Sequence, residues 1–566
     1  MKVNLRRPRR TRWAVAAALA VVGTLIALPP APRVLPAPSW QPARPEARGV
    51  FHIHTVRSDG TGTVADVAAA AARDGLRFVI LTDHGDGTRR PDPPAYRSGV
   101  LCIDAVEIST TGGHYAALAL GQTPYPLAGE PRDVADDVRR LGGFGIVTHP
   151  LSPKHDLAWR DWSVDFDGIE WLNGDSVWRD APWPRLALAA WTYAFRPLPT
   201  LARLYARPAA LARSDDFTAH RRVVLMAGAD AHARLGLRRG REPYESGLFL
   251  RVPSYRQVLA AASLRVVLPA PLSGDARRDA AAIIGAIRSG HVHTVVDGMA
   301  GPAAFEFTAG SGEARAIEGD SLPLDQAATL RVKADTPPGG RIVLYRDGRE
   351  VDRVASGALT YASNRPGAYR AEVWLDAPRD GAARPWIVGN PIYVGALEPL
   401  AAPAPPALGG PVFTAASGGP SWTVERDPRS LGTIERPGDG VGLRYTLAGG
   451  GARAPFAALV AGVGGAPGAA GLAFRGSAEA PMRISVQVRV PGAGGGRRWQ
   501  RSVYLDEFPR DVVVPFQDMR PVEPGDAASR PPAVVGSLLF VVNTLNTRRG
   551  SSGAFKVENV RLLSSR

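Results

Sequence analysis

The stretch FHIHTVRSDGTGTVADVAAAAARDGLRFVILTDHG, residues 51–85, predicts a strand, a helix and a second strand in direct succession. Thr63 is suited to cap the helix and Gly75 to end it. If residues 50–54 form a strand, His52 and His54 point to the same face, because side chains alternate along a strand. Two imidazoles on one face are unusual in packing and common in metal ligation. This pair therefore raises the question of a metal site.

The same alternation continues to about residue 298. Short apolar runs alternate with helical segments such as PRDVADDVRRLGG; the runs are FVILTD, IDAVEIS, FGIVTHP, GIEWLN and VVLMAGAD. Strands that alternate with helices indicate a parallel sheet, closed or open. We therefore expect one α/β domain over residues 49–298.

Strands dominate the rest of the chain. Residues 299–397 predict a small β-sandwich, because short strands are separated by Gly, Pro and Asp. Residues 398–412, which contain all of LEPLAAPAPPALGGP except its first residue, predict a Pro/Ala linker. Residues 413–566 predict a second all-β domain. The expected fold class is thus a multidomain chain with an α/β domain followed by two all-β sandwich or jelly-roll domains.

The N-terminus has the pattern of an export signal. Basic residues without acids precede the apolar WAVAAALAVVGTLIAL, so residues 1–28 predict an export signal or a membrane anchor, and the Pro-rich residues 29–48 a linker. As a helix the apolar stretch would span about 24 Å, short of the ~30 Å bilayer core, which favours a cleaved signal. No clean cleavage site follows the prolines, so an uncleaved anchor stays open. We expect the bulk of the chain to be exported, to the periplasm or outside the cell.

Composition excludes some classes of function. The formal charge is +15, but the first 48 residues carry nine Lys or Arg against one Glu, and no basic run follows. There is thus no specific nucleic-acid signal, and a membrane is expected as a partner only through the N-terminal segment. Cys102 is the only cysteine, which excludes an intrachain disulfide and a Cys-based zinc site.

Metal-binding residue types recur at the ends of the predicted strands. In a parallel α/β domain these ends share one edge, where sites form. Charged groups buried there without a partner are costly, and divalent metal ions are suitable partners. The nine candidate ligands are His52, His54, Asp59, His84, Glu107, His114, His149, Asp230 and His232.

The motifs HIHTVRSDG, TDHG, EIS, THP and DAH, in this order, resemble those of the PHP (polymerase and histidinol phosphatase) family of metal-dependent phosphoesterases. The resemblance implies a distorted (β/α)7 barrel with two or three divalent ions. It assigns His52, His54, Glu107 and Asp230 to one ion, Asp59, His84 and His232 to a second, and His114 and His149 to a third, with Glu107 bridging. Asp59 stands where some members have His.

The same resemblance implies the chemistry. A metal-bound hydroxide held by Glu107, Asp230 and His232 would attack a phosphomonoester or phosphodiester, and Asp83 would orient a ligand from outside. Imidazole-rich sites with carboxylates suit Mn, Fe or Zn. The expected function is an exported phosphoesterase that acts on a phosphorylated substrate of unknown class.

Two alternatives stay open. Amidohydrolase-like C–N hydrolases also begin with H-x-H but commonly bridge their metals with a modified lysine, and the only lysine between residues 49 and 298 is Lys154, in a loop. A non-catalytic exported protein that binds glycan or metal is the second alternative. The last domain resembles galactose-binding-like jelly rolls, on its strand order and FVVNTLNTRRGSSGAFKVENVRLL, which makes carbohydrate a candidate ligand.

Two further features are a tryptophan-rich segment and a second H-x-H pair. Six tryptophans lie between residues 159 and 191 and predict either an aromatic lid over the site or the core of an inserted helical subdomain. A second H-x-H pair, His291 and His293, has no acidic partner nearby in sequence. We expect it on a surface strand after a helix that stops at Gly290.

Overall fold

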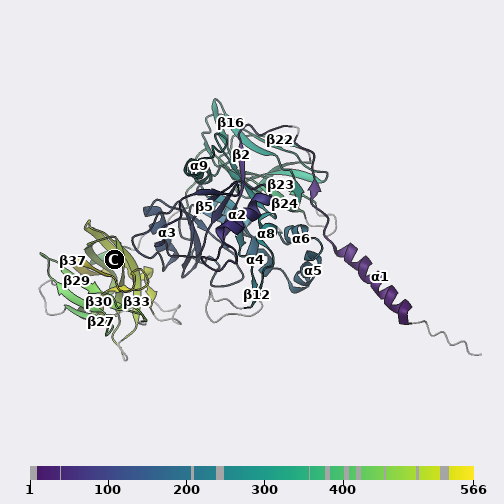
Figure 1. The fold of residues 1–566 in the computed structure, drawn as a ribbon. Coiled ribbons are helices and arrows are strands. Elements are labelled where there is room, and N and C mark those ends of the chain that lie inside the picture. The colour runs from purple at the N-terminus through teal and green to yellow at the C-terminus, as the bar shows by residue number, and fades with distance from the viewer. Residues whose placement is uncertain are drawn as a thin grey trace, which may run out of the picture. The chain divides into compact units, whose positions relative to one another are not determined.

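The computed structural model describes residues 9–38, 40–205, 209–236, 248–355, 357–376, 383–400, 407–415, 422–451, 454–492, 496–522 and 534–566 (Figure 1). The chain divides into two compact units. Unit 1 contains Met1–Gly85, Pro91–Leu120 and Val138–Leu400. Unit 2 contains Asp86–Arg90, Gly121–Asp137 and Ala401–Arg566.

The central strands of unit 1 form a closed sheet. Strand β2 lies between β3 and β10 and is parallel to both, β5 continues the sheet beyond β3, and β8 and β9 continue it beyond β10. The elements up to β10 are β2 (Glu46–Ile53), α2 (Val64–Arg73), β3 (Phe78–Leu81), β4 (Ala95–Arg97), β5 (Val100–Asp104), β6 (Val106–Thr110), β7 (Gly113–Leu118), α3 (Pro131–Arg140), β8 (Phe144–Val147), β9 (Gly168–Asn173), α4 (Gly174–Arg179), α5 (Trp183–Tyr193), α6 (Pro197–Leu204), α7 (Ala209–Thr218) and β10 (Val224–Ala231).

The sheet is mixed, whereas the alternating pattern predicted a parallel one. Strand β7 is antiparallel to both β6 and β8. The reason is local: only a tight turn joins β6 to β7, and such a turn can connect antiparallel neighbours but not parallel ones. The distorted (β/α)7 barrel is not established by these pairings and stays a prediction.

Local sequence explains the elements that carry the site. Strands β3, β8 and β9 are buried along their whole length, as continuous apolar runs predict. Helix α2 begins at a capping box in which Thr63 accepts from Asp66 N and the Asp66 carboxylate accepts from Thr63 N. Gly75, with φ of 70°, follows its C-terminus. These caps fix where helix α2 begins and ends between β2 and β3.

Residues 299–397 belong to unit 1 and share its sheet. Strand β14 pairs with β13 on one side and with β24 on the other. Asn390 donates to the carbonyls of Leu225 and Val292 and binds the two regions together. The elements are β11 (Leu235–Gly236), β12 (Phe249–Leu250), α8 (Tyr255–Leu259), β13 (Ser263–Val267), α9 (Ala276–Arg288), β14 (Val292–Val295), β15 (Ala300–Gly301), β16 (Phe305–Ser311), β17 (Ala314–Ile317), β18 (Ser321–Leu322), β19 (Ala328–Ala334), β20 (Gly340–Arg346), β21 (Arg349–Val354), β22 (Ala358–Ser363), β23 (Gly367–Leu375), β24 (Arg384–Val388) and β25 (Ile392–Val394).

The prediction that His291 and His293 lie on a surface strand is wrong. All four residues of β14 are buried. His293 Nδ1 lies 2.8 Å from Glu318 Oε1, and His291 Nε2 lies 2.8 Å from Asp320 Oδ1. These acidic partners come from the following β region, so proximity in sequence could not reveal them.

Part of the predicted Pro-rich linker, residues 29–48, makes contacts within unit 1. After α1 (Arg9–Ala27), β1 (Arg33–Val34) pairs with β15, and Trp40 Nε1 donates to Asp335 Oδ1 at 2.9 Å. Strand β2 already begins at Glu46. Among the helices that the structure describes, none is long and apolar enough to cross a membrane.

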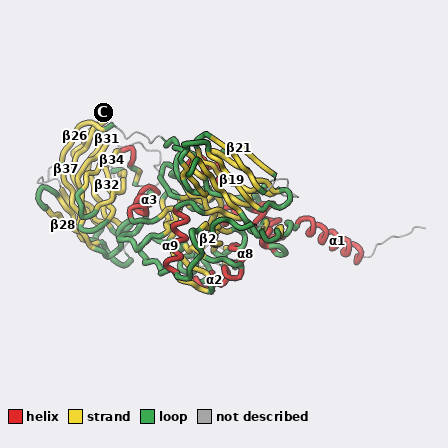
Figure 2. The backbone as a smooth tube through the Cα atoms, turned by 90° about the horizontal axis from the view of Figure 1, so that it is seen from above, coloured by secondary structure: helices red, strands yellow, loops and turns green. Residues whose placement is uncertain are grey.

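Unit 2 contains two six-stranded β-sheets, whose strands are yellow in Figure 2, and a large apolar core. One sheet has the order β28-β29-β37-β31-β34, with β26 on β37, and the other β27-β30-β36-β32-β33-β35. The strands are β26 (Leu408–Thr414), β27 (Trp422–Arg426), β28 (Leu431–Glu435), β29 (Val441–Thr446), β30 (Phe456–Pro467), β31 (Ala469–Ala478), β32 (Met482–Arg489), β33 (Arg498–Leu505), β34 (Arg510–Pro515), β35 (Arg520–Pro521), β36 (Val534–Asn543) and β37 (Ser552–Ser565).

The limits of unit 2 differ from those read in the sequence. Strand β26 begins inside the predicted 398–412 linker, of which residues 401–406 lie outside the described residues. The short segment 121–137 also belongs to this unit, because the buried Arg483 binds the carboxylate of Asp137 through two nitrogens, at 2.6 and 2.9 Å. Contacts between residues so far apart leave no local signal.

Candidate metal centre

The nine side chains singled out from the strand ends lie in one cluster in unit 1. Four overlapping groups have ligand atoms that lie within 4.8 Å of one another. The groups are His54, Asp59, His84 and His232; His52, His54 and Glu107; His52, His149 and Asp230; and His84, Glu107 and His114.

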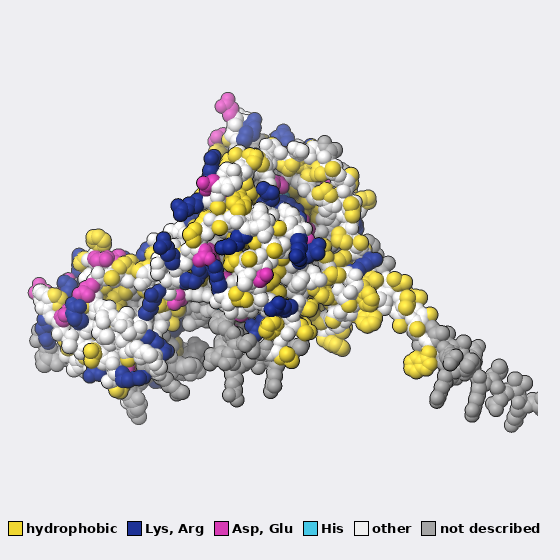
Figure 3. All heavy atoms as spheres, viewed as in Figure 1, with side chains coloured by type: hydrophobic (Ala, Val, Ile, Leu, Met, Phe, Trp, Pro, Cys, Tyr) yellow, Lys and Arg dark blue, Asp and Glu magenta, His cyan; other side chains and the backbone are white. Residues whose placement is uncertain are grey.

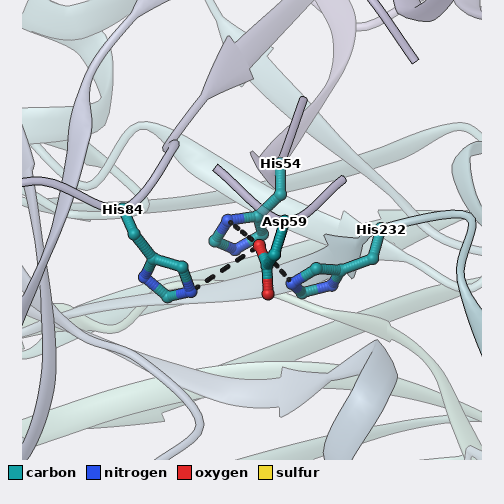
Figure 4. Close-up of side chains that lie close together, drawn as sticks. All are labelled: His54, Asp59, His84 and His232. Atoms are coloured by element: carbon teal, nitrogen blue, oxygen red, sulfur yellow. Dashed lines mark ion pairs between the residues drawn. The ribbon is translucent and has the colours of Figure 1, made fainter. Parts of the chain in front are cut away.

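The first group surrounds one carboxylate oxygen (Figure 4). Asp59 Oδ1 lies 3.2 Å from His232 Nε2, 3.5 Å from His54 Nδ1 and 3.8 Å from His84 Nε2. Asp59 comes from the loop after β2, His84 from the residues after β3 and His232 from the end of β10. Three chain segments thus converge on one point.

Glu107, on β6, occupies the middle of the cluster. Its Oε2 lies 3.3 Å from both His52 Nε2 and His54 Nε2. Its Oε1 lies 2.9 Å from His149 Nε2 and 3.4 Å from His114 Nδ1. A single carboxylate therefore faces both halves of the cluster, which is the position that a bridging ligand requires.

Asp230 closes the cluster at the end of β10. Its Oδ1 lies 3.4 Å from His52 Nε2 and from His54 Nε2. Its carbonyl oxygen faces His232 Nδ1 at 3.0 Å. Since a carbonyl can only accept, Nδ1 of His232 carries the proton and Nε2 is left to face Asp59.

Glu170, on β9, is a site residue that the sequence analysis missed. Its Oε1 accepts from His52 Nδ1 at 2.7 Å, and its Oε2 accepts from the His149 backbone N–H at 2.7 Å and from Asn173 Nδ2 at 2.8 Å. The bond to His52 fixes the imidazole so that Nε2 faces the cluster. The available signal was a glutamate within the apolar strand GIEWLN, where a buried charge needs a partner.

Room for Glu170 is made by a glycine on the neighbouring strand. A Cβ at Gly228 would lie 1.5 Å from Glu170 Oε1. Any side chain at this position would displace the carboxylate from His52. Gly228 on β10 is therefore part of what positions the first histidine.

His149 is oriented in the same way from a loop. Its Nδ1 faces the carbonyl oxygen of Leu157 at 3.0 Å, so Nδ1 donates and Nε2 faces Glu107. Thr148 Oγ1 also donates to Glu107 Oε1, at 2.7 Å. The loop after β8 thereby fixes both a candidate ligand and the central carboxylate.

Asp83, predicted to orient a ligand, acts through the turn that follows β2. Its carboxylate accepts from the backbone N–H and the hydroxyl of Thr55, at 2.7 and 2.8 Å, and from Ser58 Oγ at 2.7 Å. This turn connects His54 to Asp59. Asp83 therefore holds the segment between two candidate ligands.

The backbone is strained at three of the nine positions. His52, His149 and Asp230 have φ values of 69°, 32° and 47°. Such conformations cost roughly 1–3 kcal/mol each for non-glycine residues and cluster at functional sites. The fold maintains them where the side chains must converge.

The electrostatics of the cluster keep its carboxylates ionised. Burial by itself raises the pKa of Glu107, but the charges of His52 and His114 hold it well below its usual range. Burial lowers the pKa of His54, yet the neighbouring carboxylates of Asp230 and Glu107 raise it to about 9. His84 is the exception, since burial lowers its pKa to about 4. The raised pKa values of His52, His54, His149 and His232 place positive charge beside the buried carboxylates in the metal-free protein.

The donor set fits divalent metal ions. Three buried atoms that point into the cluster have no hydrogen-bond partner: Asp59 Oδ1, Glu107 Oε2 and His114 Nδ1. Buried polar atoms are otherwise nearly always hydrogen-bonded. A donor set of imidazoles and carboxylates suits Mn, Fe or Zn.

Two other features of the sequence are Lys154 and the six tryptophans between residues 159 and 191. Lys154 is exposed in the loop after β8. Of the six tryptophans, Trp159 and Trp171 are buried, and Trp183 and Trp191 are 76% and 55% exposed. The segment is therefore partly core and partly surface, and the predicted lid over the site stays a prediction.

Comparisons with known proteins give no family. No family model and no curated protein matches the chain. Among solved structures, a two-domain protein from Bacteroides vulgatus that contains a predicted PHP-like metal-dependent phosphoesterase matches at 16% identity, over 62% of this chain and 98% of its own, with a TM-score of 0.29. The family 11 carbohydrate-binding module of the cellulase Lic26A-Cel5E of Clostridium thermocellum matches at 17% identity, over 28% and 96%, with a TM-score of 0.22. At these TM-scores neither match supports a statement about the site or activity, and PHP membership stays a prediction.

Proposed function

We propose that this protein is a metal-dependent phosphoesterase that hydrolyses a phosphomonoester or phosphodiester. The observation that carries the proposal is the convergence of nine imidazole and carboxylate side chains around Glu107, with buried ligand atoms that lack hydrogen-bond partners. In the metal-free protein these atoms face neighbouring imidazoles or carboxylates only at 3.2–3.4 Å, outside hydrogen-bond geometry. A di- or trinuclear metal centre would pair them.

The ligand groups follow from proximity and from the motif resemblance. His52, His54, Glu107 and Asp230 would hold one ion, Asp59, His84 and His232 a second, and His114 and His149 a third, with Glu107 shared. His54 faces the first two groups through different ring nitrogens, Nε2 and Nδ1. Divalent ions bound there would lower the pKa of a coordinated water and neutralise charge on phosphate oxygens.

The protein's own residues orient and insulate the centre. Glu170 and the carbonyls of Leu157 and Asp230 hold protons on Nδ1 of His52, His149 and His232, so that each Nε2 faces inward. His52, His54 and Glu107 are almost completely buried, which strengthens electrostatic interactions within the cluster. The strained backbone keeps this arrangement ready before substrate binds.

The exposed Lys154 weighs against the alternative C–N hydrolase of the amidohydrolase type. A modified lysine bridge would have to lie at the centre of the cluster, and Glu107 lies there instead. The non-catalytic alternative is weakened by the complete ligand set.

The test is turnover of p-nitrophenyl phosphate and bis(p-nitrophenyl) phosphate by full-length protein with Mn2+ or Zn2+. We expect turnover that chelation abolishes and metal restores, and that is lost in Asp230→Asn. A folded, metal-loaded protein that cleaves p-nitroanilides or cyclic amides but neither phosphoester would replace the proposal with the C–N hydrolase.

Carbohydrate binding by unit 2 is a separate proposal. Trp422 and Trp499 are buried in this unit, while Phe508 is 75% exposed. A glycan would therefore depend mainly on polar contacts rather than on a wall of these tryptophans. Retention of the full chain on a panel of immobilised polysaccharides tests carbohydrate binding independently of catalysis. Export of the protein is also a proposal, and cell fractionation tests it.

A further inference from the structure

Helix α1 carries apolar side chains on more than one face. From Ala17 to Ala27 its only polar side chain is Thr24. Its exposed residues include Trp13 and Leu19, at 74% and 67%, and Val21 and Ile26, at 59% and 67%. At about 100° per residue these side chains point around more than half of the helix, so no single core-facing stripe accounts for them. A helix that is apolar on all sides normally lies inside protein or lipid.

A second apolar surface lies on α5 and just beyond it. Trp183, Trp191 and Phe195 are 76%, 55% and 56% exposed. The rings of Trp191 and Phe195 are in contact, with centroids 5.8 Å apart. Large exposed aromatic side chains that gather in this way mark an interaction surface.

The two surfaces are joined. Trp191 Nε1 donates to Thr24 Oγ1 at 3.3 Å, Arg196 donates to the carbonyl of Pro29 at 2.8 Å, and Arg203 donates to that of Ala27 at 3.3 Å. Leu28 is buried at this junction. Figure 3 shows apolar side chains along α1 and on the adjoining surface of the body. The end of α1 is thus held beside the exposed aromatics.

Charge identifies the occupant of this surface. The sequence has no Asp or Glu before Glu46, and none between Asp180 and Asp215, whereas both stretches carry arginines. Tryptophan is enriched where a bilayer meets water, and arginine there interacts with anionic headgroups.

We propose that α1 and the surface of Trp183, Trp191 and Phe195 together bind an anionic lipid bilayer. Helix α1 enters the apolar layer, and the aromatics of α5 lie at the headgroup level. The inference is independent of the reaction at the metal centre. It adds a second membrane contact, within the body of unit 1, to the N-terminal segment.

The test uses an environment-sensitive fluorophore on single introduced cysteines. Cys102 is the only native cysteine and is buried, and burial raises the pKa of its thiol to about 11, so an exposed cysteine is labelled selectively at neutral pH. The variants are Trp183→Cys, Val22→Cys and, as a matched control, Phe508→Cys, since Phe508 in unit 2 is as exposed as Trp183.

Each variant of the full chain is mixed with vesicles of phosphatidylcholine or of a phosphatidylcholine–phosphatidylglycerol mixture. With the anionic vesicles we expect emission at positions 22 and 183 to shift to shorter wavelength, and emission at position 508 to stay unchanged. The shift at position 183 should decrease with added salt.

Three outcomes would overturn the proposal. A shift at position 22 without one at position 183 would limit the contact to α1. A shift at position 183 that needs no vesicles and grows with protein concentration would identify a second copy as the occupant. Equal shifts with neutral and anionic vesicles would remove the role of charge.

Discussion

Replacing Glu170 by glutamine should disable the metal centre while leaving the fold intact. Glutamine has nearly the same shape as glutamate, which matters because Gly228 leaves no spare room around Oε1. Two donors, the His149 N–H and Asn173 Nδ2, point at Oε2. The amide oxygen of Gln is expected to take that position and keep both bonds, which turns the amide NH2 toward His52.

The consequence is a change of tautomer. His52 Nδ1, which donates to Glu170 at 2.7 Å, must accept from the new NH2 group, so the neutral ring carries its proton on Nε2. That nitrogen faces Glu107 Oε2 at 3.3 Å and is the atom offered to metal. A protonated Nε2 cannot bind metal. Loss of an outer partner of this kind typically lowers metal affinity about 10–100-fold, or roughly 1.4–2.8 kcal/mol.

The assay is metal affinity by chelator competition, together with phosphoester turnover and thermal unfolding. Glu318→Gln is the matched control, because Glu318 is also buried and also bonds a histidine Nδ1 at 2.8 Å, on His293, outside the cluster. We expect the control to bind metal as the wild type does. If Glu170→Gln keeps wild-type affinity to within about two-fold, the orientation of His52 by this carboxylate does not matter for metal binding.

Three other predictions concern stability. Arg483→Met should destabilise unit 2 by about 3–5 kcal/mol in chemical unfolding, because it removes the buried guanidinium that binds the carboxylates of Asp133 and Asp137, and a loss under about 1 kcal/mol would contradict this. Removing residues 1–28 should leave a folded protein. Removing residues 1–48 deletes β1 and the start of β2 and should lower Tm by about 10 °C, at roughly 2–4 °C per kcal/mol of lost stability. Equal Tm values for the two truncated proteins would show that the pairings of β1 and β2 contribute nothing to stability. The raised pKa of His54, about 9, stabilises the metal-free protein below its unfolded value near 6.5, and this contribution is lost as pH rises toward 9. Tm after chelation should therefore fall between pH 7 and 9.5 while the increase in Tm on adding metal grows, and a Tm independent of pH would refute the charge balance.

The sequence was sufficient for the candidate ligands because their signal is local. Each stands beside an apolar run, and the carboxyl ends of the parallel strands β2, β3 and β10 share one edge. The antiparallel β7 did not disturb this, since Glu107 and His114 still point inward from a hairpin. Position relative to a strand end was the informative property.

The features that were missed depend on distant partners. Glu170 is recognisable only when His52 and the His149 N–H lie beside it. The acidic partner of the buried His293 is Glu318, in the following β region. The membership of segment 121–137 in unit 2 depends on Arg483, further still. No pattern of period 2 or 3.6 encodes such pairings.

The most direct test of the central claim is the metal content of the full-length protein measured alongside its phosphoesterase rate. The protein is stripped with chelator and then titrated with Mn2+ or Zn2+. We predict that the rate rises with bound metal and saturates at two or three ions per chain, and that both saturate at lower levels in Asp230→Asn. A folded protein that binds less than one ion per chain, or that hydrolyses phosphoesters equally well when stripped, would contradict the account.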